Sequence, residues 1–369
     1  MRPEDFTAGE VAAMDEALDL AARGVRGANP LVGAVILDAD GATLATGYHR
    51  GAGTPHAEAD ALANARAARA DVTGATMVVT LEPCNHTGRT GPCSQAIIDA
   101  GLRRVVFAAP DTSDAAAGGA EALRAAGIEV ASGLGAGAAA ELNERWIAAV
   151  AERRPFVTVK IAQSLDGRIA AADGTSQWIT GPEARRDGHA LRSRVDAVLA
   201  GTGTVLADNP RLTARIPDGT PNGTPNGTAN DTDAQRQPLR VVVGRRPIPE
   251  NAAVRGTDGR FLQLALHDPA EVAADLYGRG VRHLLVEGGA ILASAFLRAG
   301  LVDELVVYTA PLLLGAGTDS LQGIGVQTLG QAPRWRWDSA AGGAVAHLGR
   351  DLRLRLQPAT AISEESEDA

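Results

Sequence analysis

Short apolar runs alternate with helical segments along most of the chain, and this alternation limits its fold more than any other feature. In the first 150 residues, strands are predicted at 32–38, 42–49, 75–81, 103–110 and 128–131, and helices at 10–23, 56–70 and 93–102. A turn at Asp40–Gly41 is expected to join the first two strands. Strands that alternate with helices predict an α/β fold, with a mostly parallel sheet covered by helices on both faces.

A second set of strands predicts a second domain. A length of 369 residues exceeds one ordinary hydrophobic core. We therefore expect domains at residues 1–150 and 151–358, with a hinge at 151–155. Strands of the second domain are predicted at 156–162, 195–201, 239–244, 283–289 and 304–311. Residues 217–238 contain no Val, Ile, Leu, Met or aromatic residue, which predicts a flexible insertion. The acidic tail, 359–369, is predicted to be disordered.

Composition argues against several classes of partner. The net charge is −9 and only 3% of residues are aromatic, so neither a basic surface nor a stacking platform for nucleic acid is expected. No apolar run is long enough to span a bilayer, and the N-terminus lacks the pattern of a signal peptide. Two cysteines in a chain of this length do not form a secreted disulfide framework. A cytoplasmic protein with a small-molecule substrate is therefore expected.

The two cysteines and one histidine occupy corresponding places in the predicted elements. Cys84 follows a strand, whereas Cys93 and His56 each begin a helix. Such positions gather at the carboxyl edge of a parallel sheet, where ligands bind. Two thiolates and one imidazole can hold zinc and leave its fourth position for water. A disulfide, or a closed zinc site with His86 as the fourth ligand, is the alternative.

Glu58 lies two residues beyond His56 and can act beside the metal as a proton carrier rather than as a ligand. His56-Ala57-Glu58, Pro83-Cys84 and Cys93 together resemble the zinc-dependent deaminases of nucleobases. In that chemistry, zinc supplies a hydroxide near neutral pH. Glu58 would move its proton to a ring nitrogen before ammonia leaves.

The spacing of the cysteines narrows the resemblance to one family. Eight residues separate Cys84 from Cys93, as in the bifunctional deaminase–reductase family of riboflavin biosynthesis. The resemblance extends over nearly the whole chain through, in order, NPLVGAV, PHAE, VTLEPCNHTGRTGPC, VKIAQSLDGRIA, SQWITG, TVLADNPRLTAR and VEGG. It implies a cytidine-deaminase-like α/β/α sandwich followed by a dihydrofolate-reductase-like α/β domain, a homo-oligomer, and zinc and NADPH as cofactors. The implied substrate is a diaminopyrimidine ribosyl phosphate, held in the deaminase by Asn29, His49, His86, Arg89 and Asp111.

The second half lacks the dinucleotide fingerprint G-x-G-x-x-G, but "VEGGA" predicts a strand, a glycine pair and a helix start that can cradle a phosphate. The resemblance implies substrate contacts from Ser176, Arg192, Leu212, Arg215 and Glu287. It implies NADPH contacts from Gln163, Trp178, Thr204, Asp208 and the segment from Gly289.

Lys160 is the only lysine among 35 basic residues. With Asp208, it is our candidate for the acid–base and electrostatic work of the reductase, since an ammonium is a compact charge with a shiftable pKa.

Departures from the family pattern leave rival interpretations open. Ser113 stands where the family has Asn, so a paralogue of another pyrimidine or pteridine-like pathway, with one half altered, is the main alternative. A nucleic-acid-editing deaminase is opposed by the acidic charge and the wide cysteine spacing. A zinc-stabilised scaffold without activity would tolerate the loss of Glu58.

Overall fold

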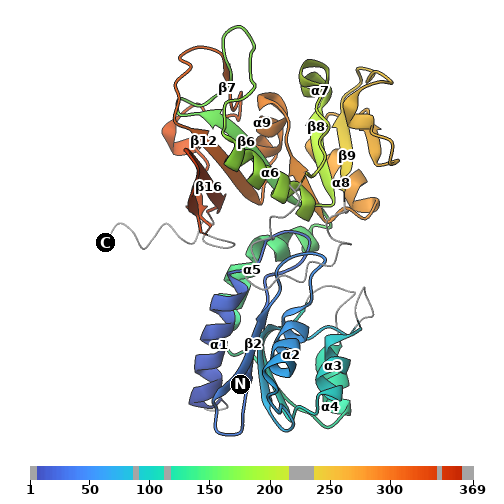
Figure 1. The fold of residues 1–369 in the computed structure, drawn as a ribbon, viewed down its shortest axis with the longest axis vertical. Coiled ribbons are helices and arrows are strands. Elements are labelled where there is room, and N and C mark those ends of the chain that lie inside the picture. Colours follow the sequence, from blue (N-terminus) through green and yellow to red (C-terminus); the bar gives the residue numbers. More distant parts are fainter. Residues whose placement is uncertain (1–5, 86–90, 112–117, 216–236, 339–342, 360–369) are drawn as a thin grey trace. The chain divides into compact units, whose positions relative to one another are not determined.

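The computed structural model describes residues 6–85, 91–111, 118–215, 237–338 and 343–359. They divide into two compact units, residues 1–151 and residues 152–369, which are described separately (Figure 1). Most of the predicted insertion and nearly all of the predicted tail lie outside the described residues. Within the described residues, no helix is long and apolar enough to cross a membrane.

The first unit is built on one five-stranded sheet in the order β2-β1-β3-β4-β5. Its elements are α1 Ala8–Ala21, β1 Gly33–Leu37, β2 Thr43–Tyr48, α2 Ala57–Ala68, β3 Thr76–Leu81, α3 Cys93–Asp99, β4 Arg104–Ala109, α4 Gly119–Ala125, β5 Glu129–Ser132 and α5 Ala136–Ala151.

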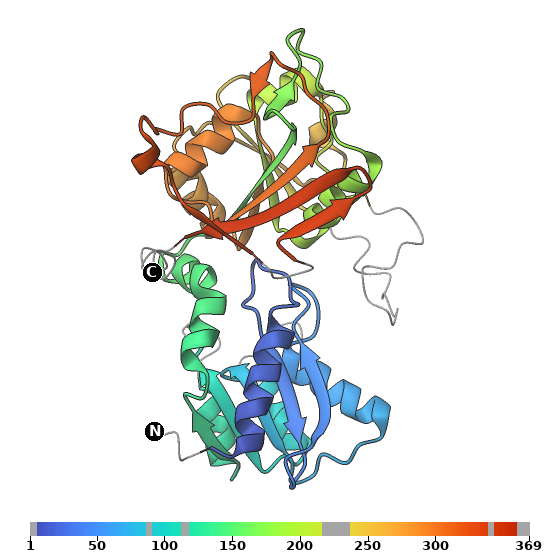
Figure 2. The same cartoon turned by 90° about the vertical axis from the view of Figure 1, so that its left-hand side faces the viewer.

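Helices cover both faces of this sheet, as Figure 2 also shows. Met14 and Ala17 of α1 pack with Val35 and Val78 on one face, together with α5. On the other face, Leu62 of α2 belongs to the core cluster to which α3 and α4 also contribute. Apolar residues on alternate sides of each strand therefore produce three layers, and the predicted α/β/α sandwich is confirmed.

The predicted turn between the first two strands is confirmed, but the prediction of a mostly parallel sheet is wrong for β1. This strand runs antiparallel to both β2 and β3, and only the β3–β4 and β4–β5 pairs are parallel. The Asp38 carboxylate accepts hydrogen bonds from the backbone N–H groups of Asp40 and Ala42, at 2.9 and 2.8 Å. This tight turn leaves no length for a crossover, so β1 and β2 pair as a hairpin.

The second unit contains a nine-stranded sheet, of which β10-β9-β8-β11-β6-β12 form a parallel set. Its elements are β6 Phe156–Ser164, β7 Arg168–Ala170, α6 Pro182–Arg194, β8 Ala197–Gly201, α7 Thr202–Asp208, β9 Leu239–Val243, η3 Ala253–Arg255, β10 Phe261–Leu264, α8 Pro269–Gly278, β11 His283–Val286, α9 Ala290–Arg298, β12 Glu304–Ala310, β13 Thr318–Asp319, η4 Leu329–Gln331, β14 Trp335–Trp337, β15 Val345–Leu348 and β16 Asp351–Pro358. Core clusters lie on both faces, with α8 and α9 on one and α6 and α7 on the other. The predicted α/β class is therefore confirmed here too.

The antiparallel end of this sheet has no counterpart in the sequence-based prediction. Strand β16, red in Figure 2, pairs antiparallel with β12, β14 and β15. Its buried residues are the polar ones: Asp351, Arg353, Arg355 and Gln357. The intervening Leu354 and Leu356 are half-buried and pack against the core cluster on the α8–α9 face, so both faces of β16 are covered.

A buried ion pair ties the start of the second unit to its sheet. The Asp303 carboxylate accepts from Arg154 Nη1 and Nη2 at 2.6 and 2.9 Å, and from the Val157 N–H at 2.8 Å. Asp303→Ala leaves the guanidinium without this carboxylate, and we expect it to lower the free energy of unfolding by about 3–5 kcal/mol. Urea denaturation would measure this loss.

The matched control is Asp275→Ala, which removes a more exposed i,i+4 pair between Asp275 of α8 and Arg279, the C-cap residue of this helix. Its expected cost is below about 1 kcal/mol. Equal losses in the two variants would contradict the account of Asp303.

Candidate active sites

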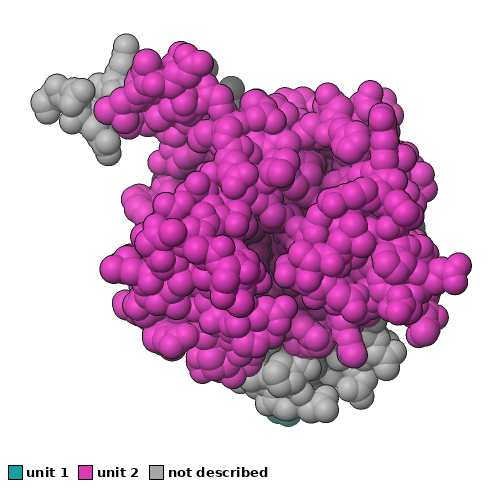
Figure 3. Space-filling view, turned by 90° about the horizontal axis from the view of Figure 1, so that it is seen from above, with its two compact units in different colours: residues 1–151 teal, residues 152–369 magenta. Residues whose placement is uncertain are grey.

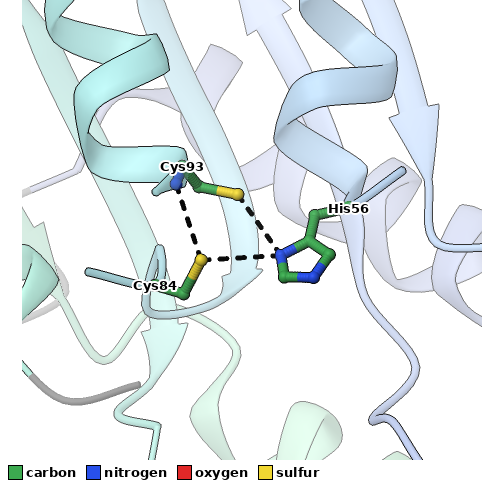
Figure 4. Close-up of side chains that lie close together, drawn as sticks. All are labelled: His56, Cys84 and Cys93. Atoms are coloured by element: carbon green, nitrogen blue, oxygen red, sulfur yellow. Dashed lines mark hydrogen bonds between the residues drawn. The ribbon is translucent and has the colours of Figure 1, made fainter. Parts of the chain in front are cut away.

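The first candidate site forms where two helices begin and one strand ends. His56 is the N-cap residue of α2, Cys93 is the first residue of α3, and Cys84 follows β3 (Figure 4). Their ligand atoms all lie within 4.8 Å of one another. The tertiary fold therefore brings together the three residues singled out by their spacing.

The distances suit a tetrahedral zinc ion. His56 Nδ1 lies 3.6 Å from Cys84 Sγ and 3.4 Å from Cys93 Sγ. Typical Zn–N and Zn–S bonds at tetrahedral angles place nitrogen and sulfur about 3.5 Å apart. The Cys93 N–H also lies 3.5 Å from Cys84 Sγ, as a donor that favours the thiolate. Both cysteines are free rather than joined in a disulfide, so this alternative is not supported.

Glu58 occupies the first turn of α2 beside this cluster and is 4% exposed. Burial raises the pKa of its carboxyl to about 7. A carboxyl of this pKa can both accept and release a proton near neutral pH. The geometry therefore places a proton carrier next to the three ligand atoms.

His49 and Asn29 form a polar wall next to the cluster. The two histidine rings, His49 and His56, meet edge to face with centroids 5.6 Å apart. His49 Nδ1 lies 2.9 Å from the Pro55 carbonyl, which can only accept, so this nitrogen carries the proton. Asn29 Nδ2 then donates to His49 Nε2 at 2.9 Å. Asn29 is thereby fixed by the neutral ring, whose pKa is lowered by burial.

Gly119 is needed because the backbone of the loop that carries Cys84 passes directly over it. A Cβ at this position would lie 1.7 Å from the Pro83 carbonyl oxygen, one residue before Cys84. Gly119→Ala is therefore expected to displace the loop, to speed zinc loss to a chelator and to lower the melting temperature of the first unit. Gly137→Ala in α5 is the control, since its Cβ would meet nothing within 4 Å. Unchanged zinc retention in Gly119→Ala would contradict this expectation.

The second candidate site is a pocket of about 570 Å³ in the second unit. The face shown in Figure 3 is hollowed near its centre. Seven of the predicted residues line the pocket, namely Lys160, Ser176, Trp178, Arg192, Asp208, Leu212 and Arg215. Trp178 is 63% exposed, which fits a residue in the wall of a binding pocket rather than a core residue.

One buried carboxylate organises the basic residues of this pocket. Glu287, just after β11, accepts from Arg192 Nε and Nη2 at 2.6 and 2.8 Å, and from Lys160 Nζ at 3.4 Å. Burial would raise the pKa of Glu287, but Arg192 and Lys160 hold it at about 2. Glu287 therefore remains ionised and sets the positions of both cations.

The glycine pair lies where the sequence predicts it, between β11 and α9. Gly289 is the N-cap residue of α9, and its N–H donates to Thr204 Oγ1 at 3.0 Å. This contact joins two residues expected at the cofactor site. Gln163, near the end of β6, is not among the residues lining the pocket, and neither are Thr204, Glu287 and Gly289.

Comparisons with known proteins show the family of this chain. Residues 155–345 match the family model for the RibD C-terminal domain, and residues 9–109 match the cytidine and deoxycytidylate deaminase zinc-binding region. The chain is 44% identical to the riboflavin biosynthesis protein RibD of Mycobacterium tuberculosis, over 94% of this chain and 98% of that protein. The chain belongs to the RibD family.

Other RibD proteins are similar over comparable lengths. The Escherichia coli RibD is 38% identical, covering 93% of this chain and 98% of its own length. The solved structure of Acinetobacter baumannii RibD is 35% identical with a TM-score of 0.73, covering 95% of this chain and 99% of that chain. A Thermotoga maritima structure is 32% identical with a TM-score of 0.71, at 95% and 99% coverage. The predicted family and its bifunctional deaminase–reductase activity in riboflavin biosynthesis are confirmed.

Some of the site residues predicted from the sequence lie outside the described residues, and the sequence did not indicate one supporting residue. His86, Arg89 and Ser113 lie outside the described residues. Asp111 is described, and its negative charge adds to the hydrogen bond with Cys84 in raising the pKa of His56. Asn143 of α5 went unnoticed, although its amide bonds both the N–H and the carbonyl of Leu31, at 2.7 and 2.9 Å, and so holds the segment that carries Asn29. No motif marked it, because its role depends on a contact between distant segments.

A second group that the sequence did not reveal lies on α6. His189 lines the pocket, and Asp187 accepts from the Tyr308 hydroxyl at 2.7 Å and from Arg353 Nη1 at 3.1 Å. For His189, the available signal was its spacing from Arg192 in "RDGHALR", because residues three apart lie on one face of a helix.

Proposed function

We propose that the first unit uses zinc to convert 2,5-diamino-6-(5-phosphoribosylamino)pyrimidin-4(3H)-one to 5-amino-6-(5-phosphoribosylamino)uracil. The second unit then reduces the ribosyl group to ribityl with NADPH. The observation that carries the first step is the convergence of His56, Cys84 and Cys93 beside the buried Glu58. The similar Thermotoga maritima protein is a diaminohydroxyphosphoribosylaminopyrimidine deaminase and 5-amino-6-(5-phosphoribosylamino)uracil reductase, which supports this choice of substrate.

In the deaminase, bound zinc would supply a hydroxide at neutral pH. His56, Cys84 and Cys93 hold the metal, and helix N-termini and N–H donors favour the thiolates. Glu58 accepts a proton from the attacking water and delivers it to the pyrimidine ring nitrogen. It then carries the second proton of that water from the new hydroxyl group to the amino group, so that the C–N bond breaks, ammonia leaves and a carbonyl remains. Asn29 and His49 orient the ring, and His86, Arg89 and Asp111 are proposed to hold the rest of the substrate.

In the reductase, bound NADPH would supply the hydride. Arg192, Arg215, Ser176, Leu212 and Glu287 are proposed to hold the substrate, with the two arginines on its phosphate. Gln163, Trp178, Thr204, Asp208 and Gly289 are proposed to hold the cofactor, with the α9 N-terminus near its phosphates. Lys160 places an ammonium near the imine nitrogen that forms when the ribose ring opens, and so favours hydride arrival at C1′. Asp208 adds negative charge at the same pocket.

One assay tests both halves. Zinc-loaded protein, the diaminopyrimidine ribosyl phosphate and NADPH are combined, and ammonia release and NADPH oxidation are followed together. Both should proceed, with NADPH oxidation dependent on prior deamination. Ammonia without NADPH oxidation would assign the second unit to another substrate, as in the paralogue alternative. Neither signal would overturn the proposed substrate.

Compartment and assembly remain predictions. We propose a cytoplasmic homo-oligomer that binds neither nucleic acid nor membrane. The two free thiols at the metal cluster are compatible with a reducing compartment. Sedimentation of the zinc-loaded protein would determine the assembly.

A further inference from the structure

The pocket contains a histidine that the proposed reaction leaves without a role. His189 lies on α6 and lines the pocket between Arg192 and Arg215. Its Nδ1 lies 3.2 Å from the Thr213 carbonyl. A carbonyl can only accept, so Nδ1 carries the proton and Nε2 presents a lone pair.

The lone pair of His189 faces the exposed Arg215. Arg215 Nε and Nη2 lie 3.3 and 3.1 Å from His189 Nε2. Burial and the charges of Arg192 and Arg215 lower the pKa of His189 to about 4, although Glu287 acts in the opposite direction. The ring is therefore neutral at physiological pH and serves Arg215 as an acceptor.

Two other cations that line the pocket are paired differently. Arg192 and Lys160 share the carboxylate of Glu287, which offsets part of their charge. Arg215 instead donates a hydrogen bond to a neutral ring. Burial and the charges of Arg192 and Arg211 lower the pKa of Arg215. An arginine oriented by an uncharged acceptor keeps its full charge for a dianionic ligand.

The Thr213 carbonyl accepts a hydrogen bond from Arg192 as well as from His189. Thr213 O also accepts from Arg192 Nη1 at 3.1 Å, so α6 holds the segment 211–215 through two side chains. Gln237 bonds the N–H and carbonyl of Ala214 at 3.0 and 2.9 Å from the other end of the insertion. These contacts hold the backbone of Thr213 and Ala214 just before Arg215. The Arg215 side chain is oriented by its hydrogen bonds with His189.

We propose that His189 is a positioning residue that aims the Arg215 guanidinium at the phosphate of the reductase substrate. This inference rests on the proposed function, because it assigns the pocket a sugar phosphate. Without the ring, the long Arg215 side chain would have to be ordered each time the phosphate binds. The cost should appear in substrate binding and not in the chemical step.

The test compares a phosphorylated and a dephosphorylated substrate in the full-length protein. His189→Leu should raise KM for 5-amino-6-(5-phosphoribosylamino)uracil about tenfold with kcat little changed. It should leave KM for the corresponding riboside unchanged. His189→Gln, whose amide offers both a donor and an acceptor, should recover most of the loss. His189→Leu combined with Arg215→Ala should bind no worse than Arg215→Ala alone.

Equal KM increases for both substrates, full additivity with Arg215→Ala, or a kcat loss with KM unchanged would each overturn the inference. Deaminase activity in the first unit reports correct folding of each variant. If the wild type reduces neither substrate, the proposed function fails, and calorimetric binding of ribose 5-phosphate decides the inference separately. Binding that is weakened by His189→Leu and restored by His189→Gln would support it, whereas no binding to the wild type would overturn it.

Discussion

Replacing Glu58 by glutamine should reduce ammonia release about 10²–10⁴-fold, which is the usual contribution of a positioned acid–base group. Glutamine keeps the volume and polarity of the side chain but cannot accept and release a proton. Because Glu58 is not one of the three ligand residues, zinc content should stay at one ion per chain. Ammonia release with the diaminopyrimidine ribosyl phosphate and metal analysis of the same sample would measure both quantities.

Two controls separate catalysis from structure. His56→Ala should lose both zinc and deamination, since it removes one ligand of the cluster. The reductase of Glu58→Gln, supplied directly with the deaminated intermediate, should work at the wild-type rate. Full deaminase activity in Glu58→Gln would contradict the proposed role of the carboxylate.

Replacing Lys160 by arginine should lower reductase turnover about 10²-fold or more while deamination continues, since electrostatic donors at a reacting centre contribute about this much. Lys160 Nζ shares Glu287 with Arg192 and lies 5.8 Å from the centre of the Tyr308 ring. A planar guanidinium is larger than an ammonium and would compete with Arg192 for the same carboxylate. NADPH oxidation with the deaminated intermediate measures the effect.

The composition of the chain makes a direct control possible. Lys160 is the only lysine, so reductive methylation with ¹³C-formaldehyde labels this side chain and the N-terminus alone. The chemical shift of the Lys160 signal should change when the substrate binds, and the signal reports the protonation state of the ammonium. A Lys160→Arg variant with full reductase activity would contradict the proposed role.

The sequence by itself determined the family, the α/β class of both units and the residues of the metal cluster. It could do so because these features depend on local patterns. Hydrophobic periodicity defines strands and helices, and His56, Cys84 and Cys93 each lie at an element boundary that periodicity locates. Apolar periodicity also predicted the parallel strands β6, β8, β9, β11 and β12, because strands buried on both faces appear as continuous apolar runs.

Only the tertiary structure decided which residues support these groups. Asn143 holds the segment of Asn29 from α5, more than a hundred residues away, and Gly119 lies beneath the Pro83 carbonyl. Strand β16 buries Arg353 and Arg355 on the face opposite to the one from which Leu354 and Leu356 pack against the core. Such contacts join segments that are distant along the chain. A single sequence does not show which distant group a polar side chain will contact in the folded protein. His189 is the same case, because its role depends on the carbonyl and the guanidinium that the fold places on either side of its ring.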